Sequence, residues 1–330
     1  MTAHPGSRAH DPAIADALRT AFADLPPETA GGRRRVLAAL LGRGIGASLT
    51  PGMHEAEGAR LGLRYVYRQF DFDRFGLGDD ALPAVIAAAR SYGLDGLNVT
   101  HPFKRAALDQ VQTLSPNAAA IGAINTIVFS EGGASGHNTD AYGFAESFRR
   151  GLPAAALDDV VLMGAGGAGL AVAHALLELG LSSLHIVDRI PDRPRSLAAG
   201  LARRFPDRSI TATSDVAAAL AGADGVVNAT PSGMAKYPGS PFDTALLRPD
   251  LWVADIVYFP AETELLRAAR AAGCRTLGGS GMALFQAVRA FDLITGLSAD
   301  PIHMARHLAE LGAAKADGAG NGAATVEGSR

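Results

Sequence analysis

Length, composition and charge set the first limits on this chain. Its 330 residues are enough for about two domains of ordinary size. Hydrophobic residues make up 48% and charged residues 19%, so the chain can build a sizeable core. A net charge of -3 without a basic stripe argues against a nucleic-acid partner. The single cysteine, Cys274, excludes an internal disulfide and a cysteine-rich metal site, and we expect no bound metal.

Targeting signals are sparse. No apolar run near the N-terminus suits a signal peptide. The stretch from Val160 to Leu177 carries no formal charge over about 18 residues, close to the lower limit for a membrane span. Four glycines and His174 interrupt it, however, so a strand, a turn and a helix explain it better. We therefore expect a cytoplasmic protein without a membrane partner.

Along the chain, short apolar runs alternate with longer helical stretches, a pattern that is typical of an α/β protein. Residues 1–34 are expected to be a flexible extension, with a helix possible over Ala13–Phe22, and residues 313–330 a disordered tail. In the first block, strands are expected at Arg35–Gly42, Leu63–Phe70, Gly96–Val99 and Ala123–Phe129, and helices at Pro51–Leu61, Ala81–Ser91 and Asn138–Arg150. In the second block, strands are expected at Val160–Met163, Leu184–Asp188, Gly225–Asn228 and Trp252–Val257, and helices at Leu170–Leu179, Glu262–Ala272 and Met282–Thr295. The boundary between the blocks is placed near residues 143–155.

A glycine-rich turn opens the second block. It contains G-x-G-x-x-G, formed by Gly164, Ala165, Gly166, Gly167, Ala168 and Gly169. The motif alone would fit any glycine turn between a strand and a helix. Here it follows an apolar strand, precedes a helix, and is followed about 20 residues later by Asp188 at the end of the next strand. This context predicts a dinucleotide site, with the pyrophosphate at the helix N-terminus.

Asp188 also bears on the choice of cofactor. Its carboxylate can accept hydrogen bonds from ribose hydroxyls, whereas it would repel the 2′-phosphate of NADP. Arg189 and Arg193 lie close by in the sequence and could bind that phosphate, although they also fit as solvated loop charges or as partners stacked on adenine. The sequence favours NAD and leaves NADP open.

Four polar segments occur at the ends of strands in the first block. They are Ser48-Leu49-Thr50-Pro51, Asn98-Val99-Thr100-His101-Pro102-Phe103-Lys104, Gly122-Ala123-Ile124-Asn125-Thr126 and Asn138-Thr139-Asp140. Each alone could be a helix cap or a turn. Asn125, which precedes an apolar run, is harder to explain in that way.

Together these segments resemble the shikimate/quinate dehydrogenase family, whose hallmarks include Ser-x-Ser/Thr-Pro, N-x-T-x-P-[FY]-K, G-A-[IV]-N-T and N-T-D. The resemblance continues through Asn228-Ala229-Thr230-Pro231, Asp255-Ile256-Val257-Tyr258 and the segment from Gly279 to Gln286. It covers roughly residues 36–312.

The resemblance implies a fold of two domains. A mixed-sheet α/β substrate domain would span residues 35–145, and a Rossmann dinucleotide-binding domain residues 146–282. The C-terminal helices, about 283–312, would return to the first domain.

The resemblance also implies the site. Lys104 and Asp140 look like the catalytic pair. The substrate pocket would be lined by Ser48, Thr50, Asn98, Thr100, Asn125, Tyr258 and Gln286. Beside the glycine turn, Asp188, Arg189 and Arg193, the cofactor would contact Asn228, Ala229, Thr230, Val257, Gly279 and Met282.

The proposed pair fits the chemistry of alcohol oxidation. The hydroxyl proton must leave as hydride moves to the nicotinamide, and a lysine can take or relay it. The ordinary lysine pKa of ~10.4 is too high for an efficient base, so the site must lower it. Asp140 would tend to raise it, and its expected part is to orient Lys104 and bind a substrate hydroxyl. Which residue is formally the base stays open, and His101 is interpreted as structural.

The substrate expectation depends on Thr50. Shikimate-specific members usually have serine there, and this chain resembles the NAD-dependent quinate/shikimate dehydrogenases of actinobacterial type. The expected reaction is reversible oxidation at ring carbon 3 of quinate to 3-dehydroquinate, of shikimate to 3-dehydroshikimate, or of both. The enzyme would serve quinate catabolism or the shikimate pathway of aromatic amino acid biosynthesis.

Other readings remain open. One is a strict shikimate or aminoshikimate dehydrogenase, which could use NADP. Another is a catalytically silent nucleotide-binding sensor, which would keep the glycine turn without needing Lys104 or Asp140. A folate-linked dehydrogenase of similar shape is a third. A homodimer is possible in each case.

Overall fold

The computed structural model describes residues 12–25 and 32–323 and divides the chain into two units. Unit 1 comprises Met1–Asn138 and Ala287–Arg330, and unit 2 comprises Thr139–Gln286. Each unit contains a six-stranded sheet with helices, which confirms the predicted α/β class. The first boundary falls before the predicted one because helix α5 (Asp140–Gly151) packs against α6 (Gly167–Glu178) of unit 2. The second boundary falls inside helix α10 (Ser280–Thr295).

The sheet of unit 1 is mixed. Its strands are β1 (Arg35–Gly42), β2 (Arg64–Asp71), β3 (Gly96–Val99), β4 (Thr113–Leu114), β5 (Thr126–Ser130) and β6 (Gly133–His137), in the spatial order β2-β1-β3-β5-β6-β4. The first three in this order run parallel, whereas β5 is antiparallel to both β3 and β6. This single reversal lets a strand end and a strand beginning share one edge of the sheet.

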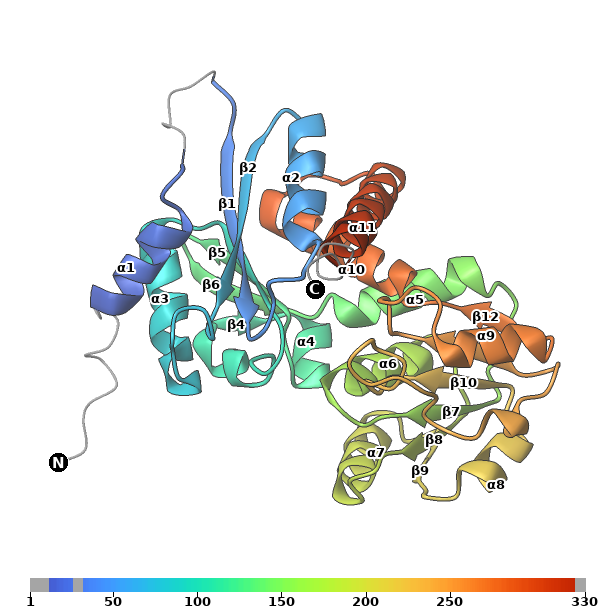
Figure 1. The fold of residues 1–330 in the computed structure, drawn as a ribbon. Helices are drawn as coiled ribbons and strands as arrows, with labels where there is room; N and C mark the ends of the chain where they lie inside the picture. Colours follow the sequence, from blue (N-terminus) through green and yellow to red (C-terminus); the bar gives the residue numbers. More distant parts are fainter. Residues whose placement is uncertain (1–11, 26–31, 324–330) are drawn as a thin grey trace. The chain divides into compact units, whose positions relative to one another are not determined.

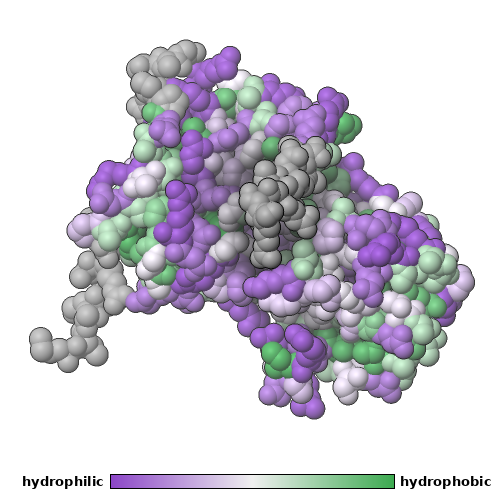
Figure 2. All heavy atoms as spheres, in the orientation of Figure 1, coloured by the Kyte–Doolittle hydropathy of each residue, from purple (hydrophilic) through white to green (hydrophobic). Residues whose placement is uncertain are grey.

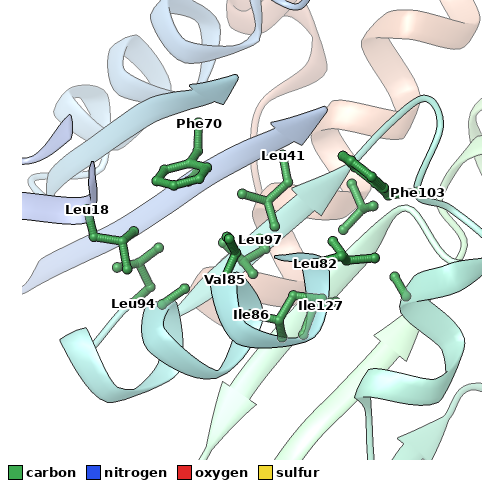
Figure 3. Packing of buried hydrophobic residues seen from close by; sticks show 14 of the residues in the cluster. Leu18, Leu41, Phe70, Leu82, Val85, Ile86, Leu94, Leu97, Phe103 and Ile127 are labelled. Atoms are coloured by element: carbon green, nitrogen blue, oxygen red, sulfur yellow. The ribbon is translucent and has the colours of Figure 1, made fainter. Parts of the chain in front are cut away.

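Helices cover both faces of this sheet. The remaining helices of unit 1 are α1 (Pro12–Ala21), α2 (Thr50–Arg60), η2 (Asp79–Ala81), α3 (Leu82–Tyr92), η3 (Ala106–Gln110), α4 (Pro116–Ile121) and α11 (Pro301–Ala323), and the C-terminal part of α10 also belongs to it. Alternate residues of β1 enter two different cores, because successive side chains of a strand point to opposite faces. Leu37 and Leu41 pack with α1 and α3, whereas Val36 and Leu40 pack with Phe291 of α10. Figure 3 shows the first of these cores, and Figure 1 shows α2 and α11 side by side.

The N-terminal segment departs from the expected flexible extension. Ile14, Leu18 and Phe22 are buried and belong to the core that α1 shares with α3. Their spacing of four residues puts them on one face of a helix, and burial of that face fixes the segment. Of the predicted extension, residues 1–11 and 26–31 lie outside the described residues.

The C-terminal segment also departs from expectation. Helix α11 continues to Ala323 and so runs through the first part of the predicted tail. Residues 324–330 lie outside the described part.

The sheet of unit 2 is entirely parallel. Its strands are β7 (Asp159–Met163), β8 (Ser183–Val187), β9 (Ser209–Ala212), β10 (Gly225–Asn228), β11 (Trp252–Asp255) and β12 (Arg275–Leu277), in the order β12-β11-β10-β7-β8-β9. Its other helices are α7 (Asp192–Arg204), α8 (Val216–Ala221), η4 (Thr244–Leu246) and α9 (Glu264–Ala271). The chain winds outward from β7 in both directions, which is the strand order of a Rossmann fold. The predicted Rossmann fold is confirmed.

The visible surface of each unit is mixed in hydropathy. Hydrophilic side chains cover much of the visible face of each unit, with smaller hydrophobic areas between them (Figure 2). Within residues 12–25 and 32–323, every helix is too short or too polar to cross a membrane.

Candidate active site

The predicted site residues of unit 1 gather at one edge of its sheet. The carboxyl ends of β1 and β3 meet there because the two strands are parallel, and β5 begins there because it is antiparallel to β3. Residues that end or follow β1 and β3, or that precede β5, therefore share this edge. They are Ser48, Thr50, Asn98, Thr100, Lys104 and Asn125.

Ser48 and Thr50 stand at the start of helix α2. The Ser48 hydroxyl donates to Thr50 Oγ1 at 3.1 Å and accepts from the Thr50 main-chain N–H at 3.3 Å. Gln69 of β2 donates to the main-chain oxygen of Ser48 at 3.1 Å and ties this loop to the sheet. Two hydroxyls beside the positive end of a helix form a suitable place for a carboxylate.

Two buried amides lie behind this edge. Asn98 is 5% exposed and Asn125 is 4% exposed. The Asn98 side-chain nitrogen donates to the main-chain oxygen of Asn125 at 3.3 Å and to Thr126 Oγ1 at 3.0 Å. Thr126 Oγ1 donates to Asn125 Oδ1 at 3.1 Å, and the Tyr67 hydroxyl donates to Asn98 Oδ1 at 2.8 Å. Sequence reasoning did not include Tyr67 or Thr126 in the site.

The loop that carries Thr100 and Lys104 is anchored by its neighbours. Phe103 is buried, and its ring centroid lies 4.4 Å from that of Phe72. The Phe103 main-chain N–H donates to Thr100 O at 2.8 Å. The N–H of Ile124 donates to Lys104 O, also at 2.8 Å, which places the Lys104 backbone beside the segment that leads to Asn125. The fold therefore brings the lysine to the same edge as the two amides.

In unit 2, the predicted glycine turn connects β7 to α6. Gly164 has a φ of 101°, which favours glycine, and a Cβ on Gly169 would collide with the main-chain oxygen of Gly164. By contrast, a Cβ on Gly166 or Gly167 would meet no protein atom within 4 Å. The conformation and packing of the protein itself therefore explain Gly164 and Gly169, but they do not explain Gly166 and Gly167. Open space over main-chain N–H groups at a helix N-terminus fits a bound pyrophosphate.

Asp188 directly follows β8 and lies over this turn. Its Oδ2 accepts from the Ala165 N–H at 2.8 Å, and its Oδ1 accepts from the Ile190 N–H at 2.9 Å. The carboxylate is therefore held in place by the main chain on both sides. Arg189 and Arg193 are exposed.

A buried carboxylate, that of Asp255, joins the loops after β10 and β11. In the sequence this residue stands out only as part of the motif Asp255-Ile256-Val257-Tyr258. Asp255, 1% exposed, accepts from Asn228 Nδ2 at 2.9 Å and from the Val257 N–H at 3.0 Å through Oδ1. Its Oδ2 accepts from Thr263 Oγ1 at 2.7 Å. Burial raises the pKa of Asp255, and the three hydrogen bonds act against that rise. Asn228 in turn accepts from the N–H and hydroxyl of Thr230 at 3.0 and 2.7 Å.

The remaining predicted cofactor residues lie around the same strand ends. Ala229 follows Asn228, and its N–H donates to the main-chain oxygen of Met163 at 2.7 Å. A Cβ on Gly279 would lie 2.7 Å from the main-chain oxygen of Val257, so these two segments touch through their backbones. A small cavity beside them is lined by Phe144, Ser147, Ala254, Asp255, Ile256, Leu277, Gly278, Gly279 and Met282. Tyr258, which follows in the chain, is 52% exposed.

Asp140 and Gln286 belong to two helices of unit 2 that cross closely. A Cβ on Gly143 would lie 2.7 Å from the Gln286 main-chain nitrogen, so α5 and α10 approach at this glycine. Asp140, 7% exposed, stands one turn earlier on α5. Lys104 belongs to unit 1 and Asp140 to unit 2, and their pairing stays a prediction.

The cysteine and the acidic and histidine side chains of the sequence are also of the types that serve as metal ligands. Among residues 12–25 and 32–323, no three His, Cys, Asp or Glu side chains are grouped so that they could hold a metal ion. Cys274 is buried, and its thiol donates to Arg248 O at 3.1 Å, as expected of a packing residue.

Comparison with known proteins identifies the family. Residues 40–127 match the model of the shikimate dehydrogenase substrate binding domain. A shikimate dehydrogenase (NADP(+)) of Streptomyces avermitilis is 54% identical over 277 residues, which cover 83% of this chain and 95% of the relative. A quinate/shikimate dehydrogenase (NAD(+)) of Corynebacterium efficiens is 47% identical over 268 residues, which cover 80% of this chain and 94% of that protein.

A solved structure agrees with these relatives. The quinate dehydrogenase of Corynebacterium glutamicum, determined in complex with NAD, has a TM-score of 0.80 and 43% identity to this chain. The likeness covers 84% of this chain and 100% of that one. Because both sequence and structure agree over 80–84% of its length, the chain belongs to the shikimate/quinate dehydrogenase family of oxidoreductases, which act on CH–OH groups.

Proposed function

We propose that this enzyme reversibly oxidises the ring hydroxyl at carbon 3 of quinate, shikimate or both, with NAD as the hydride acceptor. The products would be 3-dehydroquinate and 3-dehydroshikimate. The observation that carries the proposal is the gathering of hydroxyls, amides and one lysine at a single edge of the unit 1 sheet. A small, densely hydroxylated acid is a ligand that such a set of groups can bind without an arginine.

The substrate carboxylate would bind at the start of α2. Ser48 and Thr50 offer two hydroxyls there, and the helix N-terminus adds a partial positive charge. Thr50 carries a methyl group that a serine at this position would lack. Quinate and shikimate differ next to the carboxylate, so this methyl is placed to affect their relative binding. One methyl changes binding by only ~1–3 kcal/mol, which is compatible with activity on both acids.

Lys104 would handle the proton. In oxidation the hydroxyl proton moves to the lysine nitrogen as the hydride leaves carbon, and in reduction the ammonium returns it to the ketone oxygen. Asp140 would hold the lysine in position and bind a neighbouring hydroxyl. The nicotinamide, when bound, supplies the hydride acceptor. The protein's part is to place one hydroxyl of a polyol ring against one amine.

Asp188 supports NAD as the cofactor. Two main-chain N–H groups hold its carboxylate beside the glycine turn, where it would meet the adenosine ribose. A 2′-phosphate at that place would suffer repulsion of order 1–4 kcal/mol, depending on the effective dielectric. The NAD-dependent relative from Corynebacterium efficiens supports the same choice.

A second candidate is a strict shikimate dehydrogenase that uses NADP. The observation in its favour is the 54% identity to the Streptomyces avermitilis enzyme of that name. Arg189 and Arg193, both exposed near Asp188, would then be available to a 2′-phosphate.

Steady-state assays with both acids and both cofactors separate these candidates. We expect reduction of NAD with quinate and with shikimate, and a kcat/KM at least about tenfold lower with NADP. Asp188→Asn should narrow the gap between the cofactors, and Asp192→Asn, four residues further and exposed, should leave it unchanged. Turnover of shikimate alone, with NADP preferred, would favour the second candidate. Failure to oxidise either acid with either cofactor would refute both.

A further inference from the structure

A continuous chain of hydrogen bonds runs behind the candidate site of unit 1. It begins at the hydroxyl of Tyr67 on β2, passes through the amide of Asn98 on β3 and the hydroxyl of Thr126 on β5, and ends at Oδ1 of Asn125. All four residues are buried, with exposed fractions between 0% and 5%. Two of them, Asn98 and Asn125, are predicted to contact substrate, whereas Tyr67 and Thr126 have no assigned role.

Tyr67 reaches Asn98 across an intervening strand. In the sheet β1 lies between β2 and β3, so the two residues start two strand spacings apart, roughly 10 Å. Tyr67 pairs with Ala38 of β1, and Ala38 pairs with Gly96 of β3, which precedes Asn98 by two residues on the same face. The β1 residue between them is Ala38, whose side chain is small, and the place of a Cβ on Gly96 is taken by Ile294 of α10. The bond is therefore a product of the fold, and no local sequence pattern encodes it.

The donors around Asn98 can be assigned from chemistry alone. A main-chain carbonyl only accepts, so the Asn98 atom that faces Asn125 O must be the amide nitrogen. The other branch of the Asn98 amide is then its oxygen, and Tyr67 must donate to it. Thr126 Oγ1 accepts from the same amide nitrogen and donates its own proton to Asn125 Oδ1. Every bond in the chain points in the same direction.

The direction of these bonds limits what each amide can offer a ligand. Both N–H groups of Asn98 are used inside the protein, at Asn125 O and Thr126 Oγ1. Asn98 can therefore contact a substrate hydroxyl only as an acceptor, through its oxygen. At Asn125 it is the side-chain oxygen that faces Thr126.

We propose that Tyr67 and Thr126 are positioning residues that fix the orientation of both amides, so that Asn98 presents its side-chain oxygen to a substrate hydroxyl as an acceptor. A ring hydroxyl can donate its proton to this oxygen, since each hydroxyl donates one hydrogen bond and accepts others. This inference depends on the proposed substrates. It adds that substrate orientation is set by a tyrosine which itself stays outside the site.

The hydroxyl of Tyr67 is suited to a fixed donor. Burial raises the pKa of Tyr67 well above its ordinary value, so the proton stays on the oxygen throughout the working range of pH. The ring is held by its neighbours, with centroid distances of 4.9 Å to His54 and 6.3 Å to Tyr65. A rigid ring gives the hydroxyl little freedom to turn away from Asn98.

The same aromatic cluster contains a matched control. Tyr65 lies two residues earlier on β2, on the same face, and is 6% exposed. Its hydroxyl lies 3.3 Å from Nδ1 of His54 and has no bond to either amide among those the structure gives for the described residues. Tyr65→Phe and Tyr67→Phe therefore each remove one hydroxyl from one buried cluster. Only the second breaks the chain to Asn98.

The experiment measures kcat and KM for quinate and shikimate, and thermal unfolding, in the wild type and both variants. We expect Tyr67→Phe to lower kcat/KM roughly 3- to 10-fold, the effect of one buried hydrogen bond. Tyr65→Phe should stay within about twofold of the wild type, while both variants lose similar thermal stability. Equal kinetics in the two variants would overturn the inference. A wild type that oxidises neither acid would instead overturn the proposed function, and this inference with it.

A double-mutant cycle tests whether the residues act as one chain. Thr126→Val removes the linking hydroxyl, and Thr126→Ser keeps it as the conservative control. If Tyr67 acts through Thr126, the fold-losses of Tyr67→Phe and Thr126→Val should combine to less than their product, and Thr126→Ser should restore most of the activity. Fold-losses that multiply independently would show that the two hydroxyls act separately and would reject the shared chain.

Discussion

The two units build their sites from different kinds of group. In unit 1 the site edge is made of side-chain hydroxyls and amides, held by hydrogen bonds from other side chains such as Tyr67 and Thr126. In unit 2 it is made mainly of glycines and main-chain N–H groups, with one buried carboxylate, Asp255, joining the loops. Removal of single hydroxyls should therefore perturb unit 1, whereas added atoms or loss of Asp255 should perturb unit 2.

The difference follows from the two sheet topologies. The reversed strand β5 in unit 1 places Thr126 directly opposite Asn98 and puts side chains from several strands within hydrogen-bonding distance. The parallel sheet of unit 2 ends each strand in a loop at one edge, where main-chain groups are left for a ligand. Selection among similar ring acids suits the first arrangement, and the binding of a phosphate-rich cofactor suits the second.

Among the described residues at the unit 1 edge, Lys104 is the only lysine. Its loss should have the largest effect on turnover. Lys104→Ala should lower kcat roughly 10²- to 10⁴-fold, because proton transfer loses its positioned group. NAD binding, measured by fluorescence titration, should be unchanged because the glycine turn belongs to unit 2. Arg105→Ala, an exposed neighbour, is the control and should keep near-normal turnover. Normal turnover in Lys104→Ala would remove the proposed mechanism.

The next largest effect should come from Asp255 in unit 2. Asp255→Ala leaves the buried donors of Asn228, Val257 and Thr263 without their acceptor, and should cost about 2–4 kcal/mol in the free energy of unfolding by urea. NAD affinity should fall as well, since the loops that Asp255 joins carry predicted cofactor residues.

Asp224 provides the control for this variant. It accepts from the N–H groups of Asp158 and Asp159 at 2.8 and 2.9 Å, at the opposite end of the same sheet. Asp224→Ala should therefore lose stability without loss of NAD affinity. If both variants bound NAD equally, Asp255 would be a structural residue only.

A smaller effect concerns acid stability and compares one buried histidine in each unit. Burial lowers the pKa of His54 to about 3 and that of His174 to about 4. At His174 burial is the main cause, and the positive charge of Arg204 lowers the pKa further. Because both pKa values lie below the unfolded value of about 6.5, the stability they contribute is complete above pH 6.5 and declines as pH falls toward the folded values.

Urea unfolding at pH 7 and pH 5 measures this effect. The wild type should lose about 2 kcal/mol per buried histidine between these values. His174→Leu should remove the share of unit 2 and His54→Phe that of unit 1. Identical pH dependence in all three proteins would show that neither histidine is responsible.

Much of the fold was readable from the sequence where local pattern and tertiary structure agree. The strands Gly96–Val99 and Gly225–Asn228 were predicted with their observed bounds, since short apolar runs between turn residues are typical of buried strands. Strand β6 was missed because Gly-Ala-Ser-Gly-His has low strand propensity, and it forms through pairing with β5. The predicted strand from Ala123 begins only at Thr126, after Asn125 turns toward the site edge.

The site shows the same division. Lys104, Asn98 and Asp188 stand in motifs, so the sequence could point to them. Tyr67 reaches Asn98 only through the order of strands β2, β1 and β3, which no local pattern encodes. Local sequence patterns do not show the register between distant segments. This register decides which partner each buried polar group finds.

The smallest expected effect separates the two classes of glycine in the unit 2 turn. Gly167→Ala adds a Cβ that meets no protein atom within 4 Å at the start of α6, so thermal stability should stay unchanged or rise slightly. The same Cβ would occupy space needed by the pyrophosphate, and NAD affinity should fall about tenfold, equivalent to 1.4 kcal/mol. Gly169→Ala is the counterpart, since its Cβ would collide with Gly164 O and should lower stability even without cofactor. Unchanged NAD affinity in Gly167→Ala would mean that the open space over this turn is not the pyrophosphate site.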